Sequence, residues 1–227
     1  MVAARFRRIV LSIFAFTACA ASAQAWDDKA WCRNGNFAED GADFALYRVV
    51  AAETNLLNDQ SWGQSCPDPR SNSCYSKTNA KRGDILLTSK SYKGFVCAYS
   101  DGNAGWIALG DVEKLAQQPP VHPPIEAWVG EWRRGDDSIN FTRKGDGLHA
   151  AGVAYWPANA SAPGASAVHF GDFELDAIPA DNLAVFAGDT CTVHARLFGD
   201  YLIVKDNSAC GGVNVRFQGI FTRSKKS

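Results

Sequence analysis

Long hydrophobic runs are missing from this sequence, which has 227 residues, one methionine and four histidines. The longest apolar stretch, residues 9–18, is about half of the ~20 residues that a membrane-spanning helix needs, so we expect no transmembrane segment. Gly-x-Ser-x-Gly, His-Glu-x-x-His, phosphate-loop and dinucleotide-loop motifs are also absent. These absences argue against the corresponding hydrolases and nucleotide enzymes, and no cofactor is expected.

The N-terminus has the three parts of a secretory signal peptide. Arg5, Arg7 and Arg8 precede the apolar stretch, and the small residues at 21–25 offer two Ala-x-Ala cleavage sites. We therefore expect residues 1–25 to be removed and the mature protein to be periplasmic or secreted. Lipid attachment at Cys19 is an alternative, because the residues that lead to it resemble the lipobox of bacterial lipoproteins.

Positive charge is also scarce once residues 1–25 are set aside. The rest of the chain has 20 basic and 24 acidic residues, a net charge of −4. A protein that binds nucleic acid or an anionic membrane by electrostatic attraction carries a basic patch. Neither partner is therefore expected.

Six cysteines remain in residues 26–227, an even number that indicates disulfides in an oxidising compartment. They are Cys32, Cys66, Cys74, Cys97, Cys191 and Cys210. The last two follow a proline-rich segment and are expected to pair. The first four allow three pairings, of which we favour a Cys66–Cys74 loop staple with a long-range Cys32–Cys97 bond. No metal site is expected, because the close Cys-x-x-Cys spacing is absent.

Four prolines in residues 117–124 favour an extended segment and interrupt helices and inner strands. The sequence therefore predicts one domain at 26–116, a proline-rich linker at 117–125 and a second domain at 126–227. Short β-rich runs separated by Gly, Asp and Asn dominate both domains, and long amphipathic helices are missing. We expect an all-β protein of two small antiparallel barrels.

Strands of the first domain are expected at 44–52, 84–88, 94–99 and 105–109. The second domain has about eight expected strands, which suit a closed up-and-down barrel. They lie at 128–134, 138–143, 148–156, 168–176, 183–187, 190–198, 201–206 and 213–223.

A hairpin around Gly199-Asp200, a two-residue turn signal, fixes the register of two of these strands. Phe198 then opposes Tyr201. Alternate residues of the hairpin share its outer face: Thr192, His194, Arg196, Ile203 and Lys205. His194 is expected to be solvated there, opposite Lys205.

The same register tests the pairing of Cys191 with Cys210. Cys191 opposes Ser208, so Cys210 is its diagonal neighbour at about 7–8 Å, slightly too far for a disulfide. A bulge or a relaxed strand end near residues 211–212 would close that distance.

Four segments of the first domain resemble bacterial SH3-like (SH3b) domains: YRVVAA at 47–52, KRGDILL at 81–87, GFVCAY at 94–99 and GWIAL at 105–109. The resemblance implies a small barrel that binds cell-wall peptides or other envelope polymers without catalysis. Trp106 is expected in its core. The chain departs from the family between Asn58 and Ala80, where a long loop is expected.

That loop supplies the candidate binding residues. Trp62 and Tyr75 are aromatic side chains near the charged Asp59 and Arg70. Exposed aromatic rings beside charges suit a peptide or the edge of a glycan. The alternative is that Trp62 folds inward and caps the small core.

Gly130-Glu131-Trp132, at the start of the second domain, resembles the Gly-x-Trp of lipocalins and other calycin barrels. The resemblance implies that an arginine of the last strand, Arg223 or Arg216, packs over the tryptophan ring. Residues 202–221 also resemble a module of periplasmic proteins that carry LprI-type lysozyme-inhibitor regions. Together with calycin-type periplasmic inhibitors, this implies a lysozyme or a protease as a possible target.

Two histidines, His149 and His169, fall on neighbouring expected strands, where their rings can meet. Without a third ligand or a placed carboxylate, we expect them in structural or solvent-facing roles. Asp172, Glu174 and Asp176 share one face of a strand and are expected to be solvated.

The sequence thus predicts a non-catalytic binding protein of the bacterial cell envelope, whose partner is a wall polymer or an envelope protein. Two other classes stay open. One is an inhibitor that inserts residues 157–167 into the active site of a lysozyme or a protease. The other is a Cys–His cell-wall hydrolase, which needs a free thiolate beside a histidine.

Overall fold

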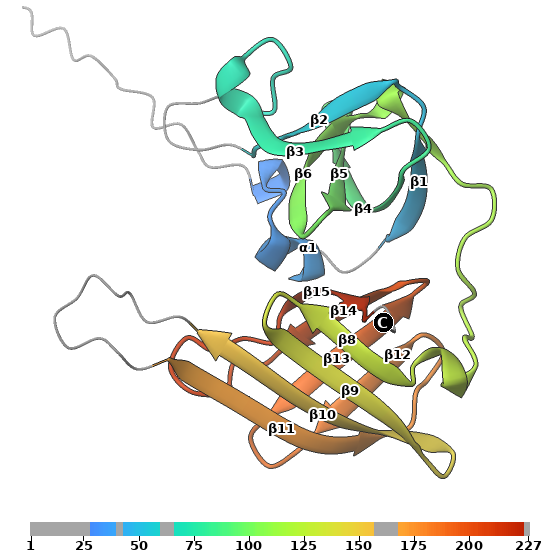
Figure 1. The fold of residues 1–227 in the computed structure, drawn as a ribbon, viewed down its shortest axis with the longest axis vertical. Helices are drawn as coiled ribbons and strands as arrows, with labels where there is room; N and C mark the ends of the chain where they lie inside the picture. The colour runs from blue at the N-terminus through green and yellow to red at the C-terminus, as the bar shows by residue number, and fades with distance from the viewer. Residues whose placement is uncertain (1–27, 40–42, 60–65, 157–167, 225–227) are drawn as a thin grey trace, which may run out of the picture.

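The computed structural model describes residues 28–39, 43–59, 66–156 and 168–224. The expected signal peptide, Cys19, Trp62 and the segment 157–167 lie outside these residues. Two antiparallel sheets make up most of the described chain, and Figure 1 shows one stacked above the other. The fold is all-β, as the sequence predicts.

The N-terminal sheet has seven strands in the order β3-β2-β6-β5-β4-β1-β7. Their bounds are β1 (Ala45–Val49), β2 (Glu53–Leu57), β3 (Tyr75–Lys81), β4 (Ile85–Tyr92), β5 (Phe95–Ser100), β6 (Asn103–Ala108) and β7 (Val112–Lys114). Short helical elements accompany them: η1 (Asp28–Ala30), α1 (Asn34–Glu39), η2 (Asn72–Cys74) and η3 (Leu109–Asp111).

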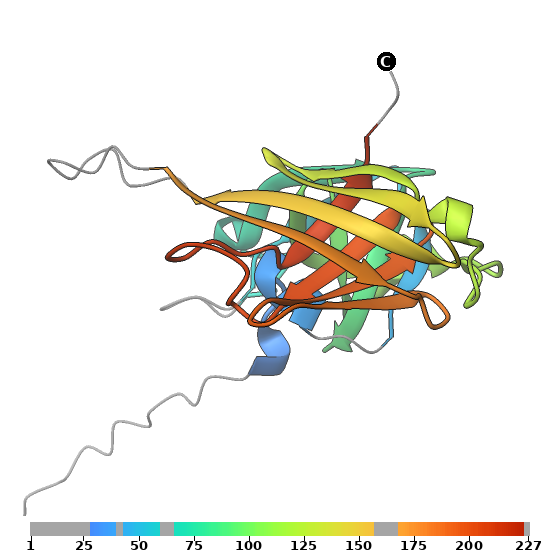
Figure 2. The same ribbon diagram turned by 90° about the horizontal axis from the view of Figure 1, so that it is seen from below.

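The C-terminal sheet has eight strands in the order β11-β10-β9-β8-β15-β14-β13-β12 and is preceded by η4 (Ile125–Ala127). The bounds are β8 (Gly130–Arg134), β9 (Asp137–Lys144), β10 (Gly147–Trp156), β11 (His169–Ala177), β12 (Leu183–Ala187), β13 (Thr192–Phe198), β14 (Tyr201–Asp206) and β15 (Gly219–Arg223). The first and last strands, β8 and β15, pair with each other. The sheet therefore curls into a nearly closed barrel whose edge strands are β11 and β12 (Figure 2).

The structure confirms the predicted hairpin register. Phe198 pairs with Tyr201 and His194 pairs with Lys205, while Gly199 in the turn has a φ of +62°. Both His194 and Lys205 are exposed. Because the turn fixes which residues oppose each other, the outward positions of both strands follow from it.

The three disulfides are those that the sequence favours: Cys32–Cys97, Cys66–Cys74 and Cys191–Cys210. The Cα atoms of Cys191 and Cys210 are 4.5 Å apart, closer than the expected diagonal. The strand relaxes earlier than residues 211–212, where this was expected, because β14 ends at Asp206 and Ser208 adopts a left-handed φ of +68°. The chain thereby turns back towards Cys191.

Arg223 is the arginine that covers Trp132. Its guanidinium carbon lies 4.4 Å from the centroid of the indole ring, and Trp132 is fully buried. The alternative, Arg216, lies over no aromatic ring in the part of the chain that the structure describes. The contact expected from the Gly-x-Trp motif is therefore present, and it involves the last strand.

Aromatic side chains fill the inside of the barrel. The Phe141 ring on β9 stacks on Phe186 of β12 with centroids 5.5 Å apart, and Phe173 on β11 meets Phe217 edge to face at 4.8 Å. Because β9 and β12 are not neighbours in the sheet, the first of these contacts crosses the interior. The centre of the barrel is thus a packed core.

A second core joins the two sheets. The Tyr99 ring of β5 meets the Tyr201 ring of β14 edge to face, with centroids 6.2 Å apart. The Phe37 ring also packs against Tyr99. Phe37 belongs to α1, an unexpected short helix that lies between the sheets in Figure 1 and contacts β6, β14 and β15. Ile203, an outward residue of the hairpin, is only 4% exposed because this core covers it.

The proline-rich segment passes from one sheet to the other and is fastened to both. The Gln118 side chain accepts a hydrogen bond from the Leu46 N–H at 2.8 Å and donates to the carbonyl oxygens of Leu46 and Leu115. Further along, His122 Nδ1 lies 2.6 Å from the carboxylate of Asp181, between β11 and β12.

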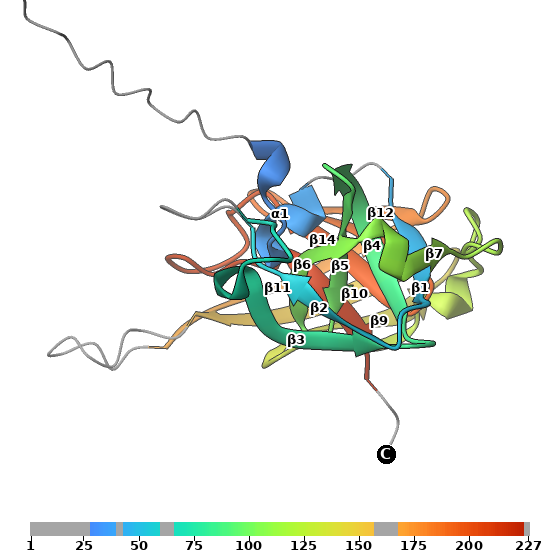
Figure 3. The ribbon, with the colours of Figure 1, turned by 90° about the horizontal axis from the view of Figure 1, so that it is seen from above.

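Two expectations for the N-terminal sheet are wrong. The strand expected at 44–52 ends at Val49, because the N–H groups of Val50 and Ala51 bond to the carbonyl of Asp111 and leave the sheet ladder. The segment 58–80, expected to be a loop, contains all of β3 except its last residue, Lys81. This strand is polar and lies at the edge of the sheet (Figure 3), so no apolar alternation announces it.

The last strand of the barrel is shorter than the expected 213–223 and begins at Gly219. The residues before it are held in another way. The carboxylate of Asp206 accepts a hydrogen bond from the Phe217 N–H at 2.7 Å, which replaces a ladder bond at that position.

Candidate functional site

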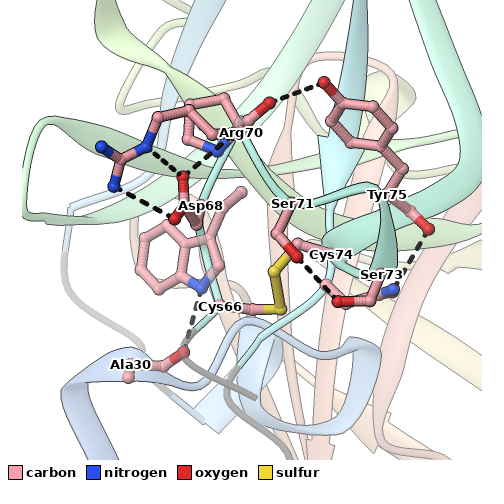
Figure 4. Close-up of a disulfide and its surroundings, with 11 residues drawn as sticks. Ala30, Cys66, Asp68, Arg70, Ser71, Ser73, Cys74 and Tyr75 are labelled. Carbon is pink, nitrogen blue, oxygen red and sulfur yellow. Dashed lines mark hydrogen bonds and ion pairs between the residues drawn. A yellow bond between two sulfur atoms is a disulfide. The ribbon is translucent and has the colours of Figure 1, made fainter.

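The Cys66–Cys74 disulfide holds the expected binding loop in a compact shape (Figure 4). Asp68 accepts hydrogen bonds from the Arg70 backbone N–H at 2.9 Å and from its guanidinium at 3.1 and 3.2 Å. The Tyr75 hydroxyl donates to the Pro69 carbonyl at 2.7 Å. The structure thus brings Arg70 close to Tyr75, the first residue of β3, and we call residues 66–75 the stapled loop.

The ion pair within this loop shifts the pKa values of both partners. The side-chain hydrogen bond from Arg70 lowers the pKa of Asp68 below 3.8, and the same bond raises the pKa of Arg70. Both groups face solvent, so the pair orders the loop more than it stabilises the fold. Because Asp68 engages the guanidinium, the loop presents a neutral ion pair beside Tyr75 in place of a bare cation.

Asp59 serves a different contact. It is 9% exposed, and its carboxylate accepts hydrogen bonds from the Cys32 N–H at 3.3 Å and from the Arg33 guanidinium. It therefore anchors the N-terminal segment to the sheet. Of the four expected binding residues, two share the loop, Asp59 has a structural position, and Trp62 lies outside the described residues.

A larger apolar surface lies at one rim of the barrel, and we call it the rim patch. It consists of Tyr155, Trp156, Val168, Phe170 and Val213, whose exposures are 46%, 46%, 60%, 62% and 68%. Tyr155 pairs directly with Phe170 across β10 and β11. Single exposed apolar side chains are common, whereas a group of them is a candidate interaction surface.

Close backbone packing assembles the rim patch from separate segments. A Cβ atom at Gly171 would lie 2.4 Å from the Cα of Gly211, so β11 and the segment after Cys210 touch backbone to backbone. His169 Nδ1 lies 2.8 Å from the Val213 carbonyl oxygen. These contacts hold Val213 beside the strand that carries Phe170.

Carboxylates continue from the rim patch along the outer face of β11. Asp172 and Glu174 are exposed, as expected. Asp176, at the far end, accepts a hydrogen bond from Lys144 and lies 2.8 Å from His149 Nδ1. The hydrogen bonds from Lys144 and then His149 lower the pKa of Asp176 below 3.8. This face therefore places exposed aromatic rings next to carboxylates.

His149 and His169 do not meet, and that part of the prediction is wrong. In the register of β10 and β11, His149 pairs with Asp176 and His169 with Trp156. The histidines thus lie at opposite ends of the hairpin, about 23 Å apart along the strands. Antiparallel pairing separates them although their strands are neighbours.

Within the described ranges, no group of three or more His, Cys, Asp or Glu side chains is arranged to hold a metal ion. Nor does any helix in that part of the chain have the length and apolar character to span a membrane. The cysteines of residues 26–227 all form disulfides.

Comparisons with known proteins give no relative: no family model matches the chain, and neither the curated proteins nor the solved structures contain a match. The fold itself establishes two antiparallel sheets, the second a nearly closed eight-stranded barrel. Three disulfides are typical of a protein that folds in an oxidising, extracytoplasmic compartment.

Proposed function

We propose that this protein is an exported, non-catalytic binding protein of the bacterial cell envelope that recognises a wall polymer through the rim patch. The observation that carries the proposal is the exposure of Tyr155 and Phe170, which pair across β10 and β11, on the face that also carries the carboxylates of Asp172 and Glu174. Flat aromatic rings offer apolar area to the faces of sugar rings, and carboxylates accept hydrogen bonds from sugar hydroxyls. A glycan strand fits that combination.

Other features support binding without chemistry. The paired cysteines leave residues 26–227 without the thiolate that a Cys–His hydrolase needs. The aromatic rings that cross the barrel occupy the space in which a small-molecule chamber would lie. A partner is then met on the surface, where the rim patch lies.

We further propose that the N-terminal sheet is an SH3-like barrel and the C-terminal sheet a calycin-like barrel. The cation–π contact between Arg223 and Trp132 supports the assignment of the C-terminal sheet as a calycin-like barrel. The SH3-like assignment is supported by Trp106, which is fully buried as expected and donates its indole N–H to the Ala30 carbonyl at 3.0 Å. SH3-like domains in envelope proteins bind wall polymers, which agrees with the proposed ligand.

Co-sedimentation of the mature protein with purified peptidoglycan sacculi tests this function. We expect retention of the unaltered protein and a loss of about ten-fold in affinity for Phe170→Ser and for Tyr155→Ser, since each removes a stacking ring. Val185→Ser, on β12 and 42% exposed, is the matched apolar control. Tyr75→Ser tests the stapled loop in the same assay.

The results distinguish the rim patch from the stapled loop as the binding surface, and they show whether the wall polymer is the ligand. Retention that survives both rim variants but is lost in Tyr75→Ser would move the site to the stapled loop. Absence of the unaltered protein from the sedimented sacculi would rule out the wall polymer.

Inhibition of a lysozyme or a protease is the second candidate. Trp156 and Val168, which flank the segment 157–167, are both exposed members of the rim patch, so a partner enzyme would meet this apolar surface around the inserted segment. Rates of lysozyme and protease action measured with excess mature protein test the idea. An unchanged rate for every enzyme would remove it.

A further inference from the structure

A cleft of about 720 Å³ opens between the two sheets, away from the rim patch. The N-terminal sheet contributes Asp84, Tyr99 and Asp101 to it, and the barrel contributes Arg133, Arg134 and Tyr201. Its volume is within the range of small-molecule sites, about 300–1,000 Å³. Its acidic side chains all come from one sheet and its basic side chains from the other.

The two tyrosines are fixed and uncharged. The Tyr99 hydroxyl donates to the Ile220 carbonyl at 3.4 Å, and the Tyr201 hydroxyl donates to the Ile85 carbonyl at 3.3 Å. Each bond crosses from one sheet to the other. Burial raises the pKa of both phenols above 10.0, so they stay neutral and hold the two walls at a set separation.

Tight turns present both carboxylates of the acidic wall. Asp84, between β3 and β4, uses one carboxylate oxygen to accept the Lys81 N–H at 2.8 Å. Asp101, between β5 and β6, has a left-handed φ of +46°. The neighbouring Gly102 carbonyl accepts a hydrogen bond from the Asn34 side chain at 2.7 Å, which steadies this turn.

The two arginines of the basic wall differ in how many of their N–H groups are already hydrogen-bonded within the protein. Arg134 is bound to the Asp137 carboxylate at 2.6 and 3.0 Å and to the Arg216 carbonyl at 2.8 Å. Arg133 is 52% exposed and uses its Nη2 group for Glu131 at 2.7 Å. Arg134 thus supports the wall, and Arg133 is the cation that presents further N–H donors to a ligand.

Within the part of the chain that the structure describes, no ion pair joins the acidic wall to the basic wall. Residues of opposite charge therefore line one cleft, and the two tyrosines that also line it join its walls by hydrogen bonds. A ligand that carries both charges would satisfy the two walls at once. A ligand with a single charge would satisfy one wall and approach a like charge on the other.

We propose that this cleft binds a short peptide with free ends, its carboxylate at Arg133 and its ammonium group at Asp101 and Asp84. Arginine suits a carboxylate because its planar N–H groups match the two oxygens. The site is separate from the rim patch and does not depend on the wall-polymer proposal.

Calorimetric titration of the mature protein with tri-alanine, whose ends are both free, tests this assignment. N-acetyl-tri-alanine lacks the ammonium group and tri-alanine amide lacks the carboxylate. We expect tri-alanine to bind and each blocked peptide to bind at least about ten-fold more weakly, because each loses one charged contact. Equal binding of all three peptides, or no binding of tri-alanine at millimolar concentration, would overturn the proposal.

Variants locate the binding. Arg133→Gln and Asp101→Asn should each weaken tri-alanine by about ten-fold, and asparagine tolerates the left-handed backbone at position 101. Arg143→Gln is the matched control, because Arg143 is 55% exposed and pairs with Glu126 at 2.6 Å, much as Arg133 pairs with Glu131. Equal weakening by Arg143→Gln would place the binding elsewhere. Thermal unfolding of each variant confirms that it is folded.

Discussion

Arg223 on the last strand of the barrel lies over the ring of Trp132 on the first strand, 4.4 Å from its centroid. The same guanidinium donates to the Val129 carbonyl at 2.8 Å and to the Ala127 carbonyl. One side chain thus binds the entry segment, the first strand and the last strand. Because β8 and β15 pair through only the two positions nearest this contact, Arg223 fastens the closure of the barrel.

Arg223→Ala should lower the free energy of unfolding by about 2 kcal/mol, because it removes a cation–π contact with the buried Trp132 ring and two hydrogen bonds from a guanidinium that is itself exposed. Arg223→Lys keeps the positive charge but loses the planar guanidinium with its several N–H donors. Its free energy of unfolding should therefore lie between those of the unaltered protein and Arg223→Ala. Urea unfolding measures both. Arg216→Ala, with its exposed side chain, is the control and should be close to neutral; a comparable loss there would contradict the role given to Arg223.

The two N-terminal disulfides should differ in their contribution to stability. Cys32–Cys97 spans 65 residues of sequence and Cys66–Cys74 spans 8. The entropy of the closed loop predicts that loss of the first costs about 4 kcal/mol and loss of the second about 2.5 kcal/mol. Urea unfolding of the two double-alanine variants checks the order. A larger cost for the 66–74 pair would show that the short loop is strongly coupled to the sheet.

Gly171→Ala should push apart the two backbone segments that hold the rim patch together. Its Cβ would meet the Gly211 Cα at 2.4 Å and the Cys210 carbonyl at 2.9 Å, which are backbone atoms. We expect a destabilisation of about 2 kcal/mol, typical of an overpacked site, together with changed amide signals at His169 and Val213. Gly110→Ala meets nothing within 4 Å and is the control. Identical spectra for Gly171→Ala and the unaltered protein would refute the close approach.

Asp176 should titrate below its ordinary value of 3.8, because Lys144 and His149 bond to its carboxylate. A depressed pKa in the folded state means that this carboxylate stabilises the fold above pH 3.8, and that the contribution is lost as the pH falls through the lowered pKa. NMR titration of the carboxyl carbon measures it. Lys144→Ala should raise the pKa of Asp176 more than His149→Ala does; no response to Lys144→Ala would exclude the lysine as the main cause.

The barrel was largely predictable from sequence because its local signals agree with its fold. Gly199-Asp200 fixes a register, alternation then sorts the inner and outer residues, and the Gly-x-Trp motif points to Arg223. The position of the proline-rich segment predicts the Cys191–Cys210 pair, whereas the first four cysteines allow three pairings, of which the favoured one is present. β3 escaped prediction because a polar edge strand has no apolar face to reveal it.

The surfaces were harder to predict than the strands. Tyr155 and Phe170 lie in β-rich runs, where aromatic residues usually belong to the core. The available signal was the alternation of inward and outward residues along a strand. Ala154 and Gly171 take the inward positions, so their neighbours Tyr155 and Phe170 point outward. The cleft between the sheets had no local signal, because Arg133 and Asp101 are brought together only by the stacking of one sheet on the other.

The most direct test of the rim-patch account is NMR mapping of the mature protein with soluble glycan fragments released from sacculi. If the rim patch binds glycan, the amide signals of Tyr155, Trp156, Phe170 and Asp172 should shift, and those of Arg70 and Tyr75 in the stapled loop should stay in place. Shifts confined to the stapled loop, or spectra that do not change at saturating glycan, would contradict it.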